Sequence, residues 1–241
     1  MGLITEQGGT ADGYEVVTLP GAADMADGLG PAVFVRRSAR PSRRAVLHLH
    51  DLTESFAPAD LARWYNERGF HFYVADLDPQ ASLEPAGRRR PARSRESCFA
   101  ELDSACAHLR DADGIDAIIL SAQASAGLTA ALWCAARRES RPVDALILSG
   151  PEFGRGLRGS LDIACPVLVI SASGGGAGSG SSRRERRASD AIRLGQHVTW
   201  LHLEDPAGDG AASGQDRKRL FDEMGRWLGA YMYGRLRDQL L

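Results

Sequence analysis

The chain has 241 residues, of which 44% are hydrophobic and 25% are charged, and its formal net charge is -2 at pH 7. These values favour one globular domain over residues 1–241, with enough apolar residues for a single core. The sequence has no basic field and no apolar run of roughly 18 residues, so we expect neither a nucleic-acid partner nor a membrane span. The first residues lack the layout of a secretory signal, which favours a cytoplasmic protein.

The use of lysine and cysteine indicates the kind of genome that encodes the chain and the redox state of its thiols. Lys218 is the only lysine among the 29 basic residues, a bias typical of a GC-rich bacterial genome. The four cysteines (Cys98, Cys106, Cys134 and Cys165) show no CxxC spacing, so we expect reduced, packed thiols. The sequence shows no metal-ligand spacing and no phosphate-binding glycine loop, and we therefore expect no metal and no cofactor.

Hydrophobic periodicity predicts strands and one helix in the first part of the chain. We expect residues 1–13 to be flexible and the Pro- and Arg-rich segment Asp78–Arg95 to be an exposed loop. The predicted elements are a hairpin of Tyr14–Leu19 with Ala32–Arg36, a strand at Ala45–His50, a helix at Pro58–Arg68 and a strand at Phe70–Leu77.

Helices and strands alternate in the rest of the chain. The low-complexity run Ser173–Arg187 predicts a flexible loop, which we place at residues 174–187. The predicted helices are Glu96–Arg110, Ser125–Arg138, Arg183–Leu194 and Asp216–Arg235, and the predicted strands are Ala117–Leu120, Ala145–Ser149, Val167–Ser171 and His197–Leu203. This alternation predicts an α/β protein with a mostly parallel sheet and helices on both faces. In such a sheet a ligand site lies beyond the carboxyl ends of the strands.

Three short sequence motifs occur in an order that is typical of a known protein family. They are "HDLTE" at residues 50–54, a "GF" that opens the strand ending at Asp76, and "SAQAS" at residues 121–125. In this order the chain resembles the α/β-hydrolases, and it is most similar to their monoacylglycerol lipase and serine aminopeptidase-like branch. The resemblance covers roughly residues 14–233 and implies an α/β-hydrolase fold.

The resemblance also implies where a Ser-His-acid triad should stand. The nucleophile position falls on Gln123, which has no nucleophilic oxygen for an acyl-enzyme. The acid position, after Ile170 and Ser171, holds no carboxylate, and the histidine position holds Asp209. All three triad positions are therefore substituted, and ordinary serine hydrolysis is not expected.

The resemblance also assigns other site residues, by their positions in this sequence. The backbone N–H groups of Leu52 and Ala124 are predicted to point at one oxygen, as in an oxyanion hole. Asp51, Ser121 and Ser125 are predicted to line the pocket. The segment between the strands that end and begin near Gly150 and Pro166 is short, so the lid of this branch is truncated or absent.

The role of several residues stays open at this level. Gln123 is either an amide that polarises a substrate oxygen or a drifted residue in a dead site. Asp209 and Glu152 are either a general acid and base or solvated loop carboxylates. His50 is either a loop-fixing residue or a proton carrier, and Ser125 and Ser121 remain candidates for a relocated nucleophile.

Three functions follow from these alternatives. The first is a non-hydrolytic acid–base catalyst of the cyclase, isomerase, dehydratase or lyase type, acting on a small molecule in specialised metabolism. The second is a pseudoenzyme that binds a small molecule or a partner protein without turnover. The third is a residual esterase or lipase that uses an unconventional serine. We favour the first.

Overall fold

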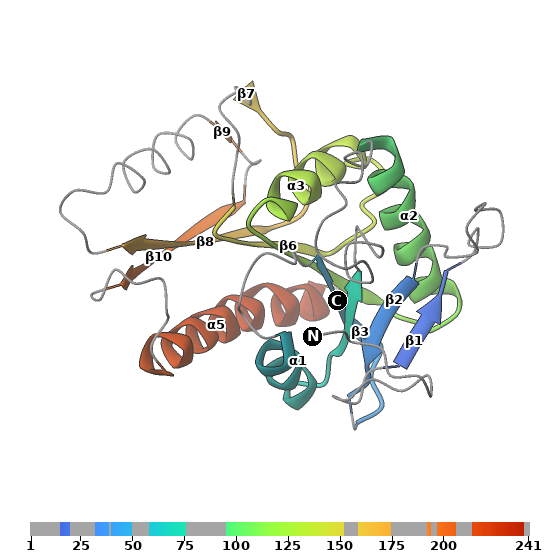
Figure 1. Ribbon diagram of the computed structural model, residues 1–241, viewed down its shortest axis with the longest axis horizontal. Helices are drawn as coiled ribbons and strands as arrows, with labels where there is room; N and C mark the ends of the chain where they lie inside the picture. Colours follow the sequence, from blue (N-terminus) through green and yellow to red (C-terminus); the bar gives the residue numbers. More distant parts are fainter. Residues whose placement is uncertain are drawn as a thin grey trace, which may run out of the picture.

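The structure, a computed structural model, describes residues 15–19, 32–38, 40–49, 58–75, 95–151, 159–174, 192–193, 197–205 and 214–238. Its centre is an eight-stranded sheet with the strand order β1-β2-β4-β3-β5-β6-β8-β10 (Figure 1). The strands are β1 (Glu15–Thr18), β2 (Ala32–Arg36), β3 (Arg44–Leu49), β4 (His71–Ala75), β5 (Ala117–Gln123), β6 (Ala145–Ser149), β8 (Val167–Gly174) and β10 (Val198–Asp205).

Strand direction divides the sheet into two parts. The predicted hairpin of β1 and β2 is confirmed, and β2 also pairs antiparallel with β4. From β4 to β10 every neighbouring pair is parallel. The prediction of a mostly parallel sheet is therefore confirmed, with the hairpin as an antiparallel extension at one edge.

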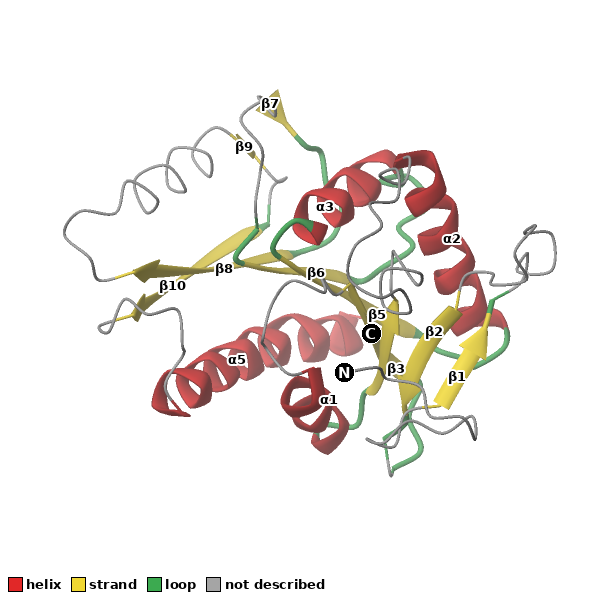
Figure 2. Cartoon of the chain, viewed as in Figure 1, coloured by secondary structure: helices red, strands yellow, loops and turns green. Residues whose placement is uncertain are grey.

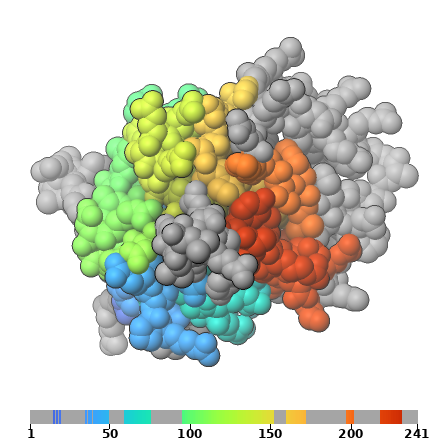
Figure 3. Space-filling view, turned by 180° about the vertical axis from the view of Figure 1, so that it is seen from behind, coloured from blue at the N-terminus to red at the C-terminus, as the bar shows by residue number. Residues whose placement is uncertain are grey.

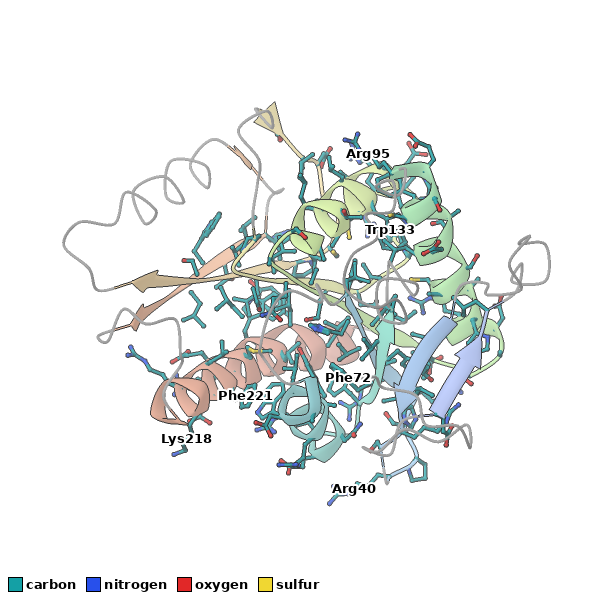
Figure 4. All side chains as sticks on the ribbon, viewed as in Figure 1. Arg40, Phe72, Arg95, Trp133, Lys218 and Phe221 are labelled. Atoms are coloured by element: carbon teal, nitrogen blue, oxygen red, sulfur yellow. The ribbon has the colours of Figure 1, made fainter. Side chains whose placement is uncertain are left out.

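Among the residues that the structure describes, two helices lie on each face of the sheet (Figure 2). The helices α1 (Pro58–Glu67) and α5 (Gly214–Asp238) share a hydrophobic cluster with one face, and α2 (Arg95–Asp111) and α3 (Ala126–Ala136) share a second cluster with the other. Phe72 belongs to the first cluster and Trp133 to the second (Figure 4). Along β5 the first four residues, Ala117–Leu120, are apolar on both sides because both faces are covered.

The secondary structure differs from the prediction in two places, at the end of β8 and in the predicted helix Arg183–Leu194. β8 continues to Gly174 instead of ending at Ser171, because its last residues pair with β10. The predicted helix Arg183–Leu194 is wrong at its end, where Ile192–Arg193 form β9 and pair with β7 (Gly159–Ser160). Residues 1–13 and 175–187, predicted to be flexible, lie outside the described residues.

All four cysteines carry free thiols, and three of them, Cys106, Cys134 and Cys165, are buried. A hydrogen bond with Cys165, together with burial, raises the pKa of the Cys134 thiol well above its usual value. Burial also raises the pKa of the Cys106 thiol, to about 12. Cys98 on α2 is half-buried. Within the described ranges, no helix is long and apolar enough to cross a membrane.

Candidate functional site

A sharp turn joins β5 to α3 at the carboxyl edge of the sheet. β5 ends at Gln123 and α3 begins at Ala126, so the chain reverses over two residues. Ala124 adopts φ of 48°, in the left-handed region, and Ser125 is already right-handed helical at φ -64° and ψ -31°. A left-handed conformation costs a residue with a side chain roughly 1–2 kcal/mol. The turn is therefore strained at Ala124.

Contacts with β6 hold this turn in place. The Ala124 N–H donates to the Ser149 carbonyl at 3.0 Å, and the Gly127 N–H donates to the Ala124 carbonyl at 3.1 Å. A Cβ added to Gly127 would lie 2.9 Å from Cβ of Pro151, just after β6. The start of α3 thus lies against the residue that follows Gly150, and a side chain at position 127 would force one of the two segments to shift.

The bonding of Ala124 corrects one prediction. Its N–H was expected to point at a ligand oxygen, but this N–H is used by the Ser149 carbonyl. The residue in the left-handed conformation is Ala124. The sequence motif predicts the apex of the bend one position earlier, at Gln123. The motif has a small residue two positions before and two positions after its central residue. Ala122 and Ala126 meet this requirement around Ala124 as well as Ser121 and Ser125 do around Gln123. This second register was missed.

Replacement of Ala124 by glycine tests whether the turn is strained. Glycine relieves the left-handed strain but loses a buried methyl group and gains unfolded-state freedom, so we expect a free energy of unfolding within about 1 kcal/mol of the unchanged protein. Ala122→Gly, in the buried and unstrained part of β5, has the same losses without the relief. We expect it to be less stable than Ala124→Gly by about 1–2 kcal/mol in urea denaturation. Equal losses in the two variants would contradict strain at Ala124.

Gln123 and Ser149 lie side by side at the ends of β5 and β6. Both are partly exposed, and strand alternation places them on the sheet face that α1 and α5 cover, together with Ile119 and Ile147. The exposed Ser125 follows the bend at the N-terminus of α3, which has no acidic residue in its first turn. The positive end of the α3 dipole therefore favours negative charge near the turn.

A serine and a histidine meet below this turn. His48 Nδ1 and Ser121 Oγ are 3.2 Å apart, and the two residues are register partners on β3 and β5. The His48 ring also stacks on Phe72, with the ring centroids 5.5 Å apart. The exposed fractions of His48 and Ser121 are 3% and 2%, so a substrate cannot reach this hydroxyl without opening the sheet face. Ser121 was predicted to line the pocket, and the structure places it in the core.

At the position where the resemblance implies a catalytic acid, the chain continues as a strand. β6 ends opposite Ile170, but β8 continues through Ser171 to Gly174 in parallel register with β10. The residues where a catalytic acid would leave the sheet are therefore part of a strand ladder.

Five further predicted site residues lie outside the described residues. They are His50, Asp51, Leu52, Glu152 and Asp209. The structure thus brings Gln123, Ala124, Ser125 and Ser149 together, and it leaves the predicted proton carriers untested.

Comparisons with known proteins were made on sequence and on structure. No protein-family model matches the sequence, and no curated protein matches it. Est1E from Butyrivibrio proteoclasticus is similar in structure, with a TM-score of 0.61 and 11% identity over 92% of this chain and 99% of that one. DcsB in complex with its substrate analogue gives a TM-score of 0.63 and 13% identity, over 90% and 99% of the two chains.

An α-beta serine hydrolase homologue from Coxiella burnetii is similar as well, with a TM-score of 0.57 and 12% identity over 89% of this chain and 96% of that one. Identities this low carry information about the fold and not about the activity. The predicted lipase and aminopeptidase-like branch remains a prediction. The parallel sheet, the helices on both faces and these likenesses together show that the chain has an α/β-hydrolase fold.

Proposed function

We propose that the protein is a non-hydrolytic acid–base catalyst that acts on a small molecule at the turn between β5 and α3. The conformation of Ala124 is the observation that carries this proposal. In hydrolases of this fold the nucleophile stands on a strained turn between a strand and a helix. Here the residue with positive φ is an alanine, whose side chain has no oxygen, sulfur or nitrogen.

The course of β8 supports the same proposal. Hydrolysis by a Ser-His-acid triad needs a carboxylate that orients the histidine. The resemblance puts that carboxylate after Ile170 and Ser171, where the chain continues as a strand paired with β10. A strand in a ladder projects its side chains to the two sheet faces, not upwards over the carboxyl edge as a loop can.

Binding at this edge would use amide and hydroxyl groups. Gln123 ends β5 and is partly exposed beside Ser149. We assign to its side-chain amide the donation of a hydrogen bond to a substrate oxygen. We assign proton transfer to Asp209, Glu152 or His50, and a further backbone donor to Leu52, all from their positions in the sequence. Acid–base catalysis of this kind uses one protonated and one ionised group at the same site.

Binding without turnover is the second candidate. It is favoured by the chemistry of the described residues at the turn, which are Gln123, Ser125 and Ser149. Amides and hydroxyls of this kind orient a ligand, but none of them exchanges a proton readily near neutral pH. A bound molecule that raises the melting temperature and is recovered unchanged would favour this candidate.

Residual ester hydrolysis is the third candidate, and the similar structures are the reason to test it. Est1E has also been solved with ferulic acid bound, and that structure matches this chain with a TM-score of 0.61 at 12% identity. A serine is needed for such chemistry here, and Ser121 is enclosed while Ser125 is exposed.

A fluorophosphonate probe separates hydrolysis from the other two candidates. We expect no adduct in the intact mass of the protein, because Ala124 offers no nucleophile and the Ser121 hydroxyl is enclosed. A serine esterase treated in parallel is the positive control. An adduct that disappears in Ser125→Ala or in Ser121→Ala would contradict the proposal and establish an unconventional serine.

Substrate turnover tests the acid–base mechanism itself. Once a converted molecule is found by incubating the protein with small-molecule extracts, we expect Gln123→Ala and Asp209→Asn each to lower its rate of conversion by at least about 10-fold. Thermal melting of each variant shows whether the fold is kept. Unchanged turnover in both variants would rule out the site as assigned.

A further inference from the structure

We propose that His71 is an acid-sensitive latch on the connection between β2 and β3, which it holds closed while the imidazole is neutral and releases when the imidazole takes up a proton. The connection is described at residues 37, 38 and 40–43, and none of these residues is buried. Hydrogen bonds rather than apolar packing therefore fix its path, and a segment held in this way can open without the rest of the fold. The blue atoms around the connection lie at the surface, between the green atoms of α2 and the teal atoms of α1 and β4 (Figure 3).

Both nitrogens of the His71 ring bond the backbone of the connection. Nδ1 accepts a hydrogen bond from the Ser38 N–H at 2.9 Å, and Nε2 lies 3.2 Å from the Ser42 carbonyl oxygen. Because a ring nitrogen that accepts carries no hydrogen, the neutral imidazole has its hydrogen on Nε2 and donates it to Ser42. The ring therefore joins both ends of the connection to the start of β4.

The Ser38–His71 bond closes the end of the β2–β4 ladder. The register of these two strands ends at the pair of Arg36 and Phe72, and both partners of the bond lie within two residues of that pair. A backbone N–H beyond the last ladder pair needs an acceptor from elsewhere, and Nδ1 supplies it. Loss of this bond would let the chain separate from β4, beginning at the end of the ladder.

Hydroxyl groups fasten the same two residues to the turn between α1 and β4. The Ser38 hydroxyl donates to the Asn66 carbonyl at 3.2 Å, and the Ser42 hydroxyl donates to the Gly69 carbonyl. Neither of these bonds involves a group that titrates. The pH sensitivity of the connection therefore lies in the imidazole.

A proton on Nδ1 affects the two ends of the connection differently. The Ser38 N–H would then face a second N–H donor, so this bond is lost, whereas Nε2 continues to donate to Ser42. The charged ring would also repel the Arg37 guanidinium, which belongs to the residue before Ser38. Protonation thus opens the Ser38 end and leaves the Ser42 end as a hinge.

Burial lowers the pKa of His71 below its ordinary value, and the positive charge of Arg37 lowers it further, against the opposing effects of the Ser42 carbonyl and the Asp113 carboxylate. The other titratable and charged groups around Arg37 and Asp113 are Glu15, which pairs with Arg37, and Tyr73 and His108, which contact Asp113; Arg44 and Arg68 lie at the nearby Gly69 turn. A histidine whose pKa is lower in the folded chain than in the unfolded chain contributes stability above the unfolded pKa, and this contribution is lost as the pH falls through the folded pKa. The latch is therefore closed near neutral pH and open in acid.

Amide hydrogen exchange tests the latch at a single residue. After correction for intrinsic rates, protection of the Ser38 amide should fall by at least about 3-fold between about pH 7.5 and about pH 5, because the opened state takes up the proton. Protection of the Arg44 amide, which donates to Ser42 Oγ at 3.1 Å, should stay constant. Protection of Ser38 that is absent or equal at both pH values, or an equal loss at Ser38 and Arg44, would overturn the proposal.

Two variants assign the pH dependence to one imidazole. His71→Gln replaces the ring by an amide that does not titrate, so protection of Ser38 should be the same at both pH values, whatever its size. His108→Gln removes the imidazole that lies 3.7 Å from Asp113, and it is the matched control that should keep the loss in acid. A loss that persists in His71→Gln, or disappears only in His108→Gln, would contradict a latch at His71.

Nitrogen NMR of the unchanged protein covers the case in which His71→Gln loses its fold. The His71 ring should carry its hydrogen on Nε2 at neutral pH and should take up a proton at a lower pH than histidine in a peptide does. A ring that carries its hydrogen on Nδ1, or that titrates at or above the peptide value, would overturn the proposal.

Discussion

Replacing Gly127 by alanine is expected to lower the free energy of unfolding by about 1–2 kcal/mol. A helix gains up to about 1 kcal/mol from such a change, but overpacking of a closed site costs typically 1–3 kcal/mol or more. The added Cβ would lie 2.9 Å from Cβ and 3.3 Å from Cα of Pro151, and the second of these atoms belongs to the backbone. The start of α3 or the chain after β6 must therefore move.

Gly229→Ala in α5 is the matched control for this prediction. A Cβ at Gly229 has no atom within 4 Å among the described residues. Only the helix propensity changes there, so we expect a gain of up to about 1 kcal/mol. Urea denaturation of the two variants measures both values. A Gly127→Ala protein as stable as Gly229→Ala would show that α3 and Pro151 do not meet closely.

Replacement of two buried tyrosines by phenylalanine should have different effects on the free energy of unfolding. The Tyr73 hydroxyl donates to Asp113 Oδ2 at 2.6 Å and lies 3.5 Å from Arg37 Nη1. A hydrogen bond to a charged group contributes about 1.5–3 kcal/mol, so Tyr73→Phe should destabilise the fold by about that amount. The Tyr65 hydroxyl is buried and has no hydrogen-bond partner among the described residues.

Tyr65→Phe should therefore leave stability unchanged or raise it by about 1 kcal/mol or more, because a buried unsatisfied hydroxyl is costly. Burial raises the pKa of Tyr65 above its usual value, so the group stays protonated and keeps its need for an acceptor. Thermal melts of both variants under one buffer give the comparison. A clear loss of stability in Tyr65→Phe would mean that the hydroxyl has a partner, such as an internal water.

Local sequence patterns were enough to predict most of the fold. The alternation of apolar strands and amphipathic helices gave the parallel sheet, and Gly69, with φ of 76°, ends α1 where expected. The helix predicted near Ile192 failed because pairing with Gly159 and Ser160, distant in sequence, decides its conformation. β8 was predicted too short for the same reason, since its last residues depend on β10.

The candidate site was harder to predict than the fold. A run of small residues from Ser121 to Ala126 fits the turn motif in two registers, and composition does not choose between them. The choice depends on the bond from Ala124 to Ser149, a residue on the next strand. The contact of His48 with Ser121 likewise needs the β3–β5 register, which no local pattern contains. Pairings across strands therefore decide which residue bends and which hydroxyl is enclosed.

The thiols of the core have a practical consequence. Alkylating reagents attack thiolates, and burial keeps Cys106 and Cys134 protonated and out of reach in the folded chain. Cys98 is the more accessible of the four. The rate at which the buried cysteines become alkylated, followed by mass spectrometry, thus reports opening of the interior without any engineered probe.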